Sequence, residues 1–144
     1  MNGRLIFGSL DNQVYAVRAD NGHRLWAVDV GDRVSRPLAL WHASVESEGQ
    51  PREVDAVLVA PDDALSVLAL DVFDGARLAR LPVEKLPEGN AIVSAPLVTE
   101  DGRVVVAHQG YAPEEASVVV LKLAAAPAAS TPAAQPGEAP AAPL

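Results

Sequence analysis

The sequence predicts an all-β protein built from repeated units of short strands. A motif repeats: VYAV at Val14–Val17 returns as VLAL at Val67–Leu70, 53 positions later, and Gly22 and Gly75 share that spacing. Short apolar segments alternate with Asn-Gly or Asp-Gly turns, which favour hairpins. No long segment has the 3.6-residue period of an amphipathic helix. Such self-similarity is typical of repeat folds, in which each unit buries its apolar face against a neighbour.

The first unit extends from Arg4 to Val30 and predicts three strands. The first two are Leu5–Phe7 and Val14–Val17, rich in the aliphatic, β-branched and aromatic residues that strands favour. Asn21-Gly22 then predicts a tight turn, because this pair tolerates positive φ angles. The third strand, Leu25–Val30, alternates apolar residues on one face.

The second unit predicts four strands, with a polar insert after the first. The insert, Glu46–Glu53, is so highly charged that we expect a solvated loop. The predicted strands are Val34–Trp41, Val54–Val59, Leu65–Leu70 and Ala76–Leu81.

The third unit predicts three more strands, Ile92–Thr99, Val104–Ala107 and Val118–Leu123, which brings the total to about ten. The tail from Ala124 to Leu144 is mostly Ala and Pro. Because such a segment cannot offset its ordering entropy by burial, we expect it to be disordered.

Composition excludes several classes of function. The chain has 144 residues, 49% of them apolar, a formal net charge of −8 and no cysteine. The acidic balance disfavours nucleic-acid binding, which needs clustered Lys and Arg. No apolar run approaches the ~20 residues of a membrane helix, so direct membrane insertion is not expected. Disulfides and thiolate metal sites are excluded. Met1-Asn2-Gly3 leads directly into strand-like sequence, which by default indicates a cytoplasmic chain, or a periplasmic or extracellular one if an upstream signal peptide is missing.

Candidate chemistry is sparse. The histidines lack metal-ligand spacing and are predicted to be surface or rim residues; they are His23, His42 and His108. Several turn aspartates are predicted to accept hydrogen bonds from nearby backbone amides rather than to bind calcium; they are Asp11, Asp62, Asp63, Asp74 and Asp101. We therefore predict no catalytic, cofactor-binding or metal-binding residue. Trp41-His42, beside the polar insert, is a candidate interaction loop, although we favour Trp41 as filling between sheets.

The first unit has the order of a known repeat. Gly8-Ser9, Asp11, the strand holding Tyr15, the turn at Gly22 and the strand holding Trp26 follow one another. This order resembles the repeat of PQQ-like, quinoprotein-type β-propellers. In that repeat a terminal Trp lies between neighbouring blades, the four-stranded sheets that make up a propeller.

The later units carry weaker marks of the same repeat. Gly75 matches the turn glycine, whereas Ala79 stands where the first unit has Trp26. SRPL and SAPL, which contain Pro37 and Pro96, resemble the start of a blade's first strand.

The resemblance implies antiparallel four-stranded blades in an incomplete propeller of about two and a half blades. Residues 1–123 would form the repeats, with a partial blade at 3–31, a blade at 33–82 and a partial blade at 91–123. Residues 124–144 would be the tail. The open edges would be covered by the remaining blades of a longer chain or by self-association, since unpaired strands invite pairing.

The function that we expect is that of a non-enzymatic scaffold or protein-binding module, similar to the outer-membrane-assembly type of this family. Its protein partner would meet the loops between strands, chiefly Trp41–Glu53, Pro82–Asn90 and Gly110–Glu115. The alternative is a fragment of a PQQ-dependent quinoprotein dehydrogenase. Only that alternative implies PQQ and calcium as cofactors, and no residue here matches the family's cofactor set.

Overall fold

A computed structural model describes residues 3–47, 49–83, 91–109 and 117–121. These residues form eleven strands and no helix, so the all-β prediction is confirmed. No helix in this part of the chain is long and apolar enough to span a membrane. The predicted tail, 124–144, and the loop segments 84–90 and 110–116 lie outside the described residues.

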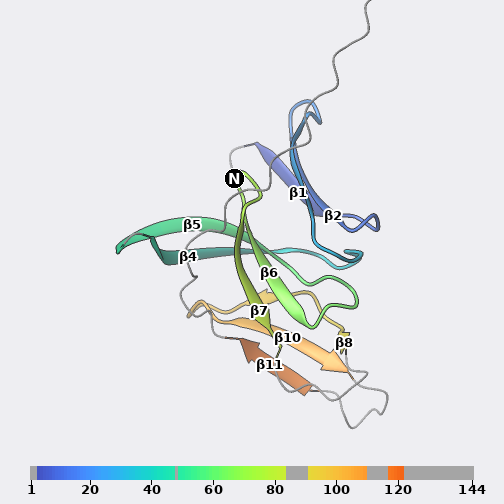
Figure 1. Ribbon diagram of the computed structural model, residues 1–144, viewed down its shortest axis with the longest axis vertical. Helices are drawn as coiled ribbons and strands as arrows, with labels where there is room; N and C mark the ends of the chain where they lie inside the picture. The colour runs from blue at the N-terminus through green and yellow to red at the C-terminus, as the bar shows by residue number, and fades with distance from the viewer. Residues whose placement is uncertain (1–2, 48, 84–90, 110–116, 122–144) are drawn as a thin grey trace, which may run out of the picture.

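The strands form three antiparallel sheets, in chain order. The first sheet has the order β1 (Arg4–Gly8), β2 (Gln13–Arg18), β3 (Arg24–Asp29). The middle sheet has the order β4 (Ala39–Ser47), β5 (Gln50–Val59), β6 (Ser66–Asp71), β7 (Arg77–Pro82). In the third sheet β10 (Val104–Gln109) pairs with β11 (Ser117–Leu121) on one side and with both β8 (Ala91–Ile92) and β9 (Leu97–Val98) on the other. Figure 1 shows the middle sheet between the other two.

Where β5 and β6 pair, the middle sheet is buried on both faces, which is why Ala56–Val59 and Val67–Leu70 are continuously apolar. Consecutive residues of β5 point to opposite faces. Val57 belongs to a cluster with Val14 and Trp26 of the first sheet. Leu58 belongs to a second cluster, with Val104 and Val106 of the third sheet. Apolar burial between neighbouring sheets therefore holds the stack together.

The repeat seen in the sequence is a repeat of backbone geometry. The Gly22 amide donates to the Arg18 carbonyl at 2.8 Å, and 53 positions later the Gly75 amide donates to the Asp71 carbonyl at 2.9 Å. Both glycines have positive φ, 72° and 76°. The register shifts by one residue beside each turn: between Ala16 and Val17 of β2 in the first sheet and, at the matching position, between Ala69 and Leu70 of β6 in the middle sheet.

Three predicted segments differ from the structure. The polar insert Glu46–Glu53 was expected to be a loop, but β4 and β5 continue through it as a paired hairpin, with Glu46 opposite Pro51. Gln50–Glu53 of β5 are all exposed, so this part of the hairpin has no buried face. Its strands therefore show no alternation of apolar and polar residues by which they could be predicted. The first strand of this sheet begins at Ala39 rather than Val34, because Val34 and Ser35 bond elsewhere: their amides donate to the Ser9 carbonyl and the Asp62 carboxylate.

The predicted strand Ile92–Thr99 is split into β8 and β9. At the break the Ala107 amide donates to the Ser94 hydroxyl at 2.8 Å instead of to a backbone carbonyl. Pro96, two residues later, has no amide hydrogen to give to the ladder. A side chain thus replaces the ladder bond where β8 ends.

Candidate functional site

The contact between the first two sheets is built around Trp26. This residue of β3 is 9% exposed, and its indole Nε1 donates to the Val72 carbonyl at 3.3 Å. The ring lies over Gly75, where an added Cβ would come within 2.9 Å of the indole Cδ2. Gly75 therefore satisfies two demands, a positive φ and close approach of the backbone to an aromatic ring.

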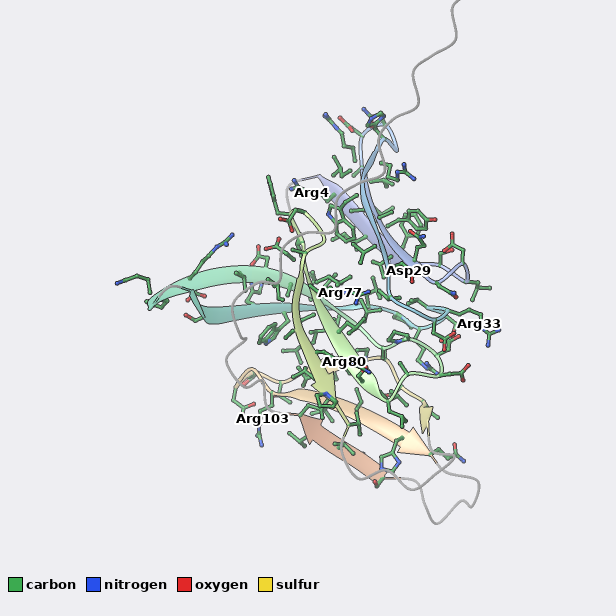
Figure 2. All side chains as sticks on the ribbon, viewed as in Figure 1. Arg4, Asp29, Arg33, Arg77, Arg80 and Arg103 are labelled. Carbon is green, nitrogen blue, oxygen red and sulfur yellow. The ribbon has the colours of Figure 1, made fainter. Side chains whose placement is uncertain are left out.

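Two arginines add to this contact. Arg77 donates from Nη2 to the Asp29 carbonyl, so β7 is tied to the end of β3. The guanidinium of Arg4, on β1, lies 4.6 Å from the ring centroid of Phe73 in the β6–β7 turn, a cation–π geometry. Figure 2 shows Arg77 and Asp29 close together where the two sheets meet.

Gly8 ends β1 at another close approach. A Cβ at Gly8 would fall 2.2 Å from Cγ1 of Val34, which is 4% exposed. The Val34 amide donates to the Ser9 carbonyl at 2.9 Å. The absence of a side chain at Gly8 thus lets the chain cross from the first sheet toward the second.

Asp62 fastens the segment that leads into β4. Its Oδ1 accepts the Ser35 amide at 3.2 Å, the Ser35 hydroxyl at 2.7 Å and the Arg36 guanidinium at 3.2 Å. Burial acts to raise the pKa of this carboxyl, but the Ser35 bonds and the nearby guanidinium outweigh it and lower the pKa. Pro37, which follows, is exposed, whereas Pro96 in the third sheet is buried.

Asp11 and Tyr15 form a second polar pair, on the first sheet. The Tyr15 hydroxyl donates to Asp11 at 2.6 Å, and its ring stacks on Phe7 with centroids 5.7 Å apart. Hydrogen bonds from Tyr15 and Ser9 lower the pKa of Asp11, and the same bond raises the pKa of Tyr15. The pair closes the β1–β2 turn, where Asn12 has a φ of 71°.

The five turn aspartates were predicted to accept hydrogen bonds from nearby backbone amides, but their bonding partners differ. Asp11 accepts from the Gln13 amide at 3.2 Å and Asp74 from the Ala76 amide at 2.8 Å, as predicted. Asp62 instead binds Ser35 and Arg36, which are distant in sequence. The remaining two bind side chains: Asp101 accepts from the Thr99 hydroxyl and pairs with Arg103 at 2.6 Å, and Asp63 lies 4.0 Å from Arg33.

The candidate interaction loop is part of the β4–β5 hairpin. Trp41 is 5% exposed and belongs to the cluster between the middle and third sheets. The side chain of its neighbour His42 is 81% exposed and pairs with Asp55 at 2.6 Å. Trp41 is therefore filling between sheets, while His42 points to solvent.

His108 was expected at the surface, and that expectation was wrong. It is 6% exposed on β10, and its Nε2 hydrogen-bonds the Ser117 hydroxyl on β11. Sequence alone gave no sign of this, since the position lies beyond the predicted end of the strand at Ala107.

The β4–β5 hairpin reaches beyond the rest of its sheet. β4 pairs with β5 along its whole length, but β6 pairs only with Ala56–Val59 of β5. The part before Ala56 is thus a two-stranded ribbon, and Figure 1 shows it projecting away from the stack. Pro51 has no amide hydrogen on the β5 half of the ribbon, whereas the β4 half, residues 42–47, contains no proline. Among the described residues, no strand pairs with the other side of β4, so the ribbon presents β4 as an open strand edge.

Metal chemistry finds no support among these residues. In the described segments, no three His, Asp or Glu side chains come together as a metal site. An open pocket of about 290 Å³ beside β1 is lined by Gly3, Arg4, Arg18, Asp20 and Leu25. Two of its charged side chains, Arg18 and Asp20, form a salt bridge at 2.8 Å.

Comparisons with known proteins bear on this geometry. A family model described as outer membrane protein assembly factor BamB matches residues 1–138. Among solved structures, the chain is similar to a europium-containing methanol dehydrogenase, with 22% identity and a TM-score of 0.54. That similarity covers 76% of this chain and 19% of the dehydrogenase, so the chain spans less than a fifth of its length. At this identity the likeness shows a shared fold. No curated protein sequence matches the chain.

Proposed function

Because the chain belongs to the outer membrane protein assembly factor BamB family of PQQ-like β-propeller repeats, we propose that it is a non-enzymatic protein-binding module. Its partners would be polypeptides in the assembly of outer membrane proteins. The observation that carries this proposal is the ribbon formed by β4 and β5. A partner in an extended conformation can add to the open edge of β4 by backbone hydrogen bonds.

The rigid stack supports this role. Trp41 anchors the base of the ribbon between two sheets, so the edge is held at a fixed position and little ordering entropy is lost on binding. The exposed pair His42 and Asp55 lies at this base, on the two strands of the hairpin. A strand added along β4 would contact this pair.

Site-specific photocrosslinking tests the proposal. A photoreactive residue replaces His42 in one variant and Leu10 in another; Leu10 is 66% exposed in the β1–β2 turn. Each variant is mixed with a denatured outer-membrane β-barrel protein diluted from urea. We expect crosslinks from position 42 and few from position 10. Equal crosslinking from both positions, or none from position 42, would refute the ribbon as the binding edge.

The second candidate function is a segment of a PQQ-dependent quinoprotein dehydrogenase. The structural similarity to methanol dehydrogenase favours it, although the described residues supply no donor set for the metal. Dye reduction by the chain with PQQ, calcium or europium, and methanol would establish this function. We expect no turnover above that of the cofactors alone.

A further inference from the structure

The two faces of the β4–β5 ribbon differ at its base, where it leaves the stack. Consecutive residues of a strand lie on opposite faces, so Trp41 and His42 mark the two sides of β4. Trp41 is 5% exposed, and Val54 of β5, on the same side, is also 5% exposed. On the other side the side chains of His42 and Asp55 are 81% and 62% exposed. One face of the base is therefore apolar and covered, and the other is polar and in water.

The covered face continues into the third sheet. Trp41 belongs to the same buried cluster as Val104 and Val106 of β10, and Val98 of β9 packs against this cluster. β9 also contacts β4. A strand added beside β4 would place every second side chain on this face, next to Trp41. An apolar side chain gains free energy by leaving water there, whereas a charged side chain loses its hydration at a cost.

The exposed face carries two carboxylates. Asp55 and Glu53 are two residues apart on β5, so both lie on the side of His42, and both are exposed. Neighbouring strands lie about 4.8 Å apart, so a strand added to the open side of β4 would lie about 10 Å from β5. Charges at that distance still interact at moderate salt, and a Lys or Arg side chain can extend across β4 to shorten it. This face therefore favours polar side chains in the added strand, and basic ones most.

We propose that the ribbon selects an extended segment in which apolar residues alternate with polar or basic ones. This inference rests on the proposed function, because it concerns the strand that β4 accepts. The alternation follows from the unlike faces at the base of the ribbon, since the two-residue period of a strand sends alternate side chains to each face. Strands of membrane β-barrels have this period, with apolar side chains toward lipid and polar ones toward the lumen. Unfolded segments of such barrels therefore fit the ribbon.

Binding of synthetic peptides to the full chain tests this selection. The first peptide has about ten residues, the length of a barrel strand, and alternates Val with Lys. The second has the same residues, with all the valines together at one end. Fluorescence anisotropy of the labelled peptides measures the two dissociation constants. We expect the alternating peptide to bind at least about tenfold more tightly, because the second peptide must place Lys beside Trp41.

Charge reversal on the exposed face tests the preference for basic residues. Glu53→Lys should weaken binding of the alternating peptide about threefold, and high salt should remove this difference. Asp63→Lys is the matched control, because Asp63 is an exposed carboxylate in the loop after β5, at the other end of that strand from Glu53. It makes the same change in net charge and should leave binding unaltered. Circular dichroism should show both variants folded, since both side chains are in solvent.

The possible results separate this inference from the proposed function. Equal binding of the two peptides, or binding of neither, would overturn selection by alternation. A Glu53→Lys effect no larger than that of Asp63→Lys would overturn the preference for basic residues. Photocrosslinking of the denatured barrel protein at position 42 decides the proposed function separately, because it requires only that a strand adds to β4.

Discussion

Trp26 and Gly75 lie in contact across the boundary between the first two sheets, so close that any side chain at position 75 would enter the space of the indole. One residue comes from β3 and the other from the β6–β7 turn of the next sheet. Two features of the fold therefore depend on Gly75: the positive φ of its turn and the close packing of the two sheets. Its energetic weight can be measured, because the chain provides a second glycine with the same backbone angle.

Gly75→Ala should destabilise the fold more than Gly22→Ala does. Both glycines have φ near +75°, at 76° and 72°, so each substitution costs about 1 kcal/mol of left-handed strain. Only at Gly75 does the new Cβ meet Val28 and Trp26, at 2.8 and 2.9 Å, which should add about 1–3 kcal/mol. Urea unfolding of the two variants measures the difference. Equal losses would show that the sheets are not in contact here.

Gly8→Ala should be destabilising and should be partly rescued by Val34→Ala. The added Cβ at position 8 overlaps Cγ1 of Val34, and overpacking of this kind costs about 1–3 kcal/mol. Removing the Val34 methyl groups relieves the 2.2 Å contact with Cγ1 but leaves Cβ of residue 34 at 2.6 Å, so the rescue should be incomplete. A double-mutant cycle measures the coupling, which should be favourable. Additive effects of the two substitutions would mean that Gly8 and Val34 do not touch.

Trp41→Ala should cost about 3–5 kcal/mol in the free energy of unfolding, because a large buried ring leaves a cavity. The adjacent His42→Ala should change it by less than about 0.5 kcal/mol, since that side chain is in solvent. Chemical denaturation compares the two neighbours. A similar, small effect of both substitutions would place Trp41 at the surface instead.

Stability should fall in acid through Asp62. The folded pKa of Asp62 is below its usual value, so its contribution to stability is fully present above the unfolded pKa, about 3.9, and is lost as pH falls through the folded pKa. Asp62→Asn should therefore destabilise the chain at neutral pH. The difference in the free energy of unfolding between this variant and the unmodified chain should shrink as the pH falls below about 3.9. Asp63→Asn, which removes an exposed charge nearby, is the control. A difference in the free energy of unfolding that does not change with pH would contradict the role of the Asp62 carboxylate.

Much of the fold could be predicted from the sequence, because repetition is a strong signal. The 53-residue spacing located two turns and the strands around them, and the resemblance identified the propeller family. The β4–β5 ribbon was missed, because a ribbon with both faces in solvent has no apolar alternation to reveal it. The break between β8 and β9 was missed as well, because it depends on a hydrogen bond between Ser94 and Ala107, residues on different strands.

The exposed apolar faces show a different limit. Alternation in β1 and β2 marks two apolar faces, but which one is covered depends on where neighbouring sheets pack. Leu5 and Leu58 look alike in sequence, yet Leu5 is 57% exposed and Leu58 is fully buried. The difference in exposure depends on which sheets pack against each other, so it cannot be predicted from the local sequence around either leucine.

The central claim is that the sheets bury one another's apolar side chains, so that both faces of the middle sheet are buried where β5 and β6 pair. The most direct test is the free energy of unfolding of Val57→Ala and Leu58→Ala, measured by urea denaturation. These consecutive residues of β5 are 2% and 0% exposed and point in opposite directions. Our account predicts that both substitutions are destabilising, by about 1–3 kcal/mol for Val57 and about 2–5 kcal/mol for Leu58. If either substitution costs no more than a surface change, one face of the middle sheet is open to water and the stacking described here is wrong.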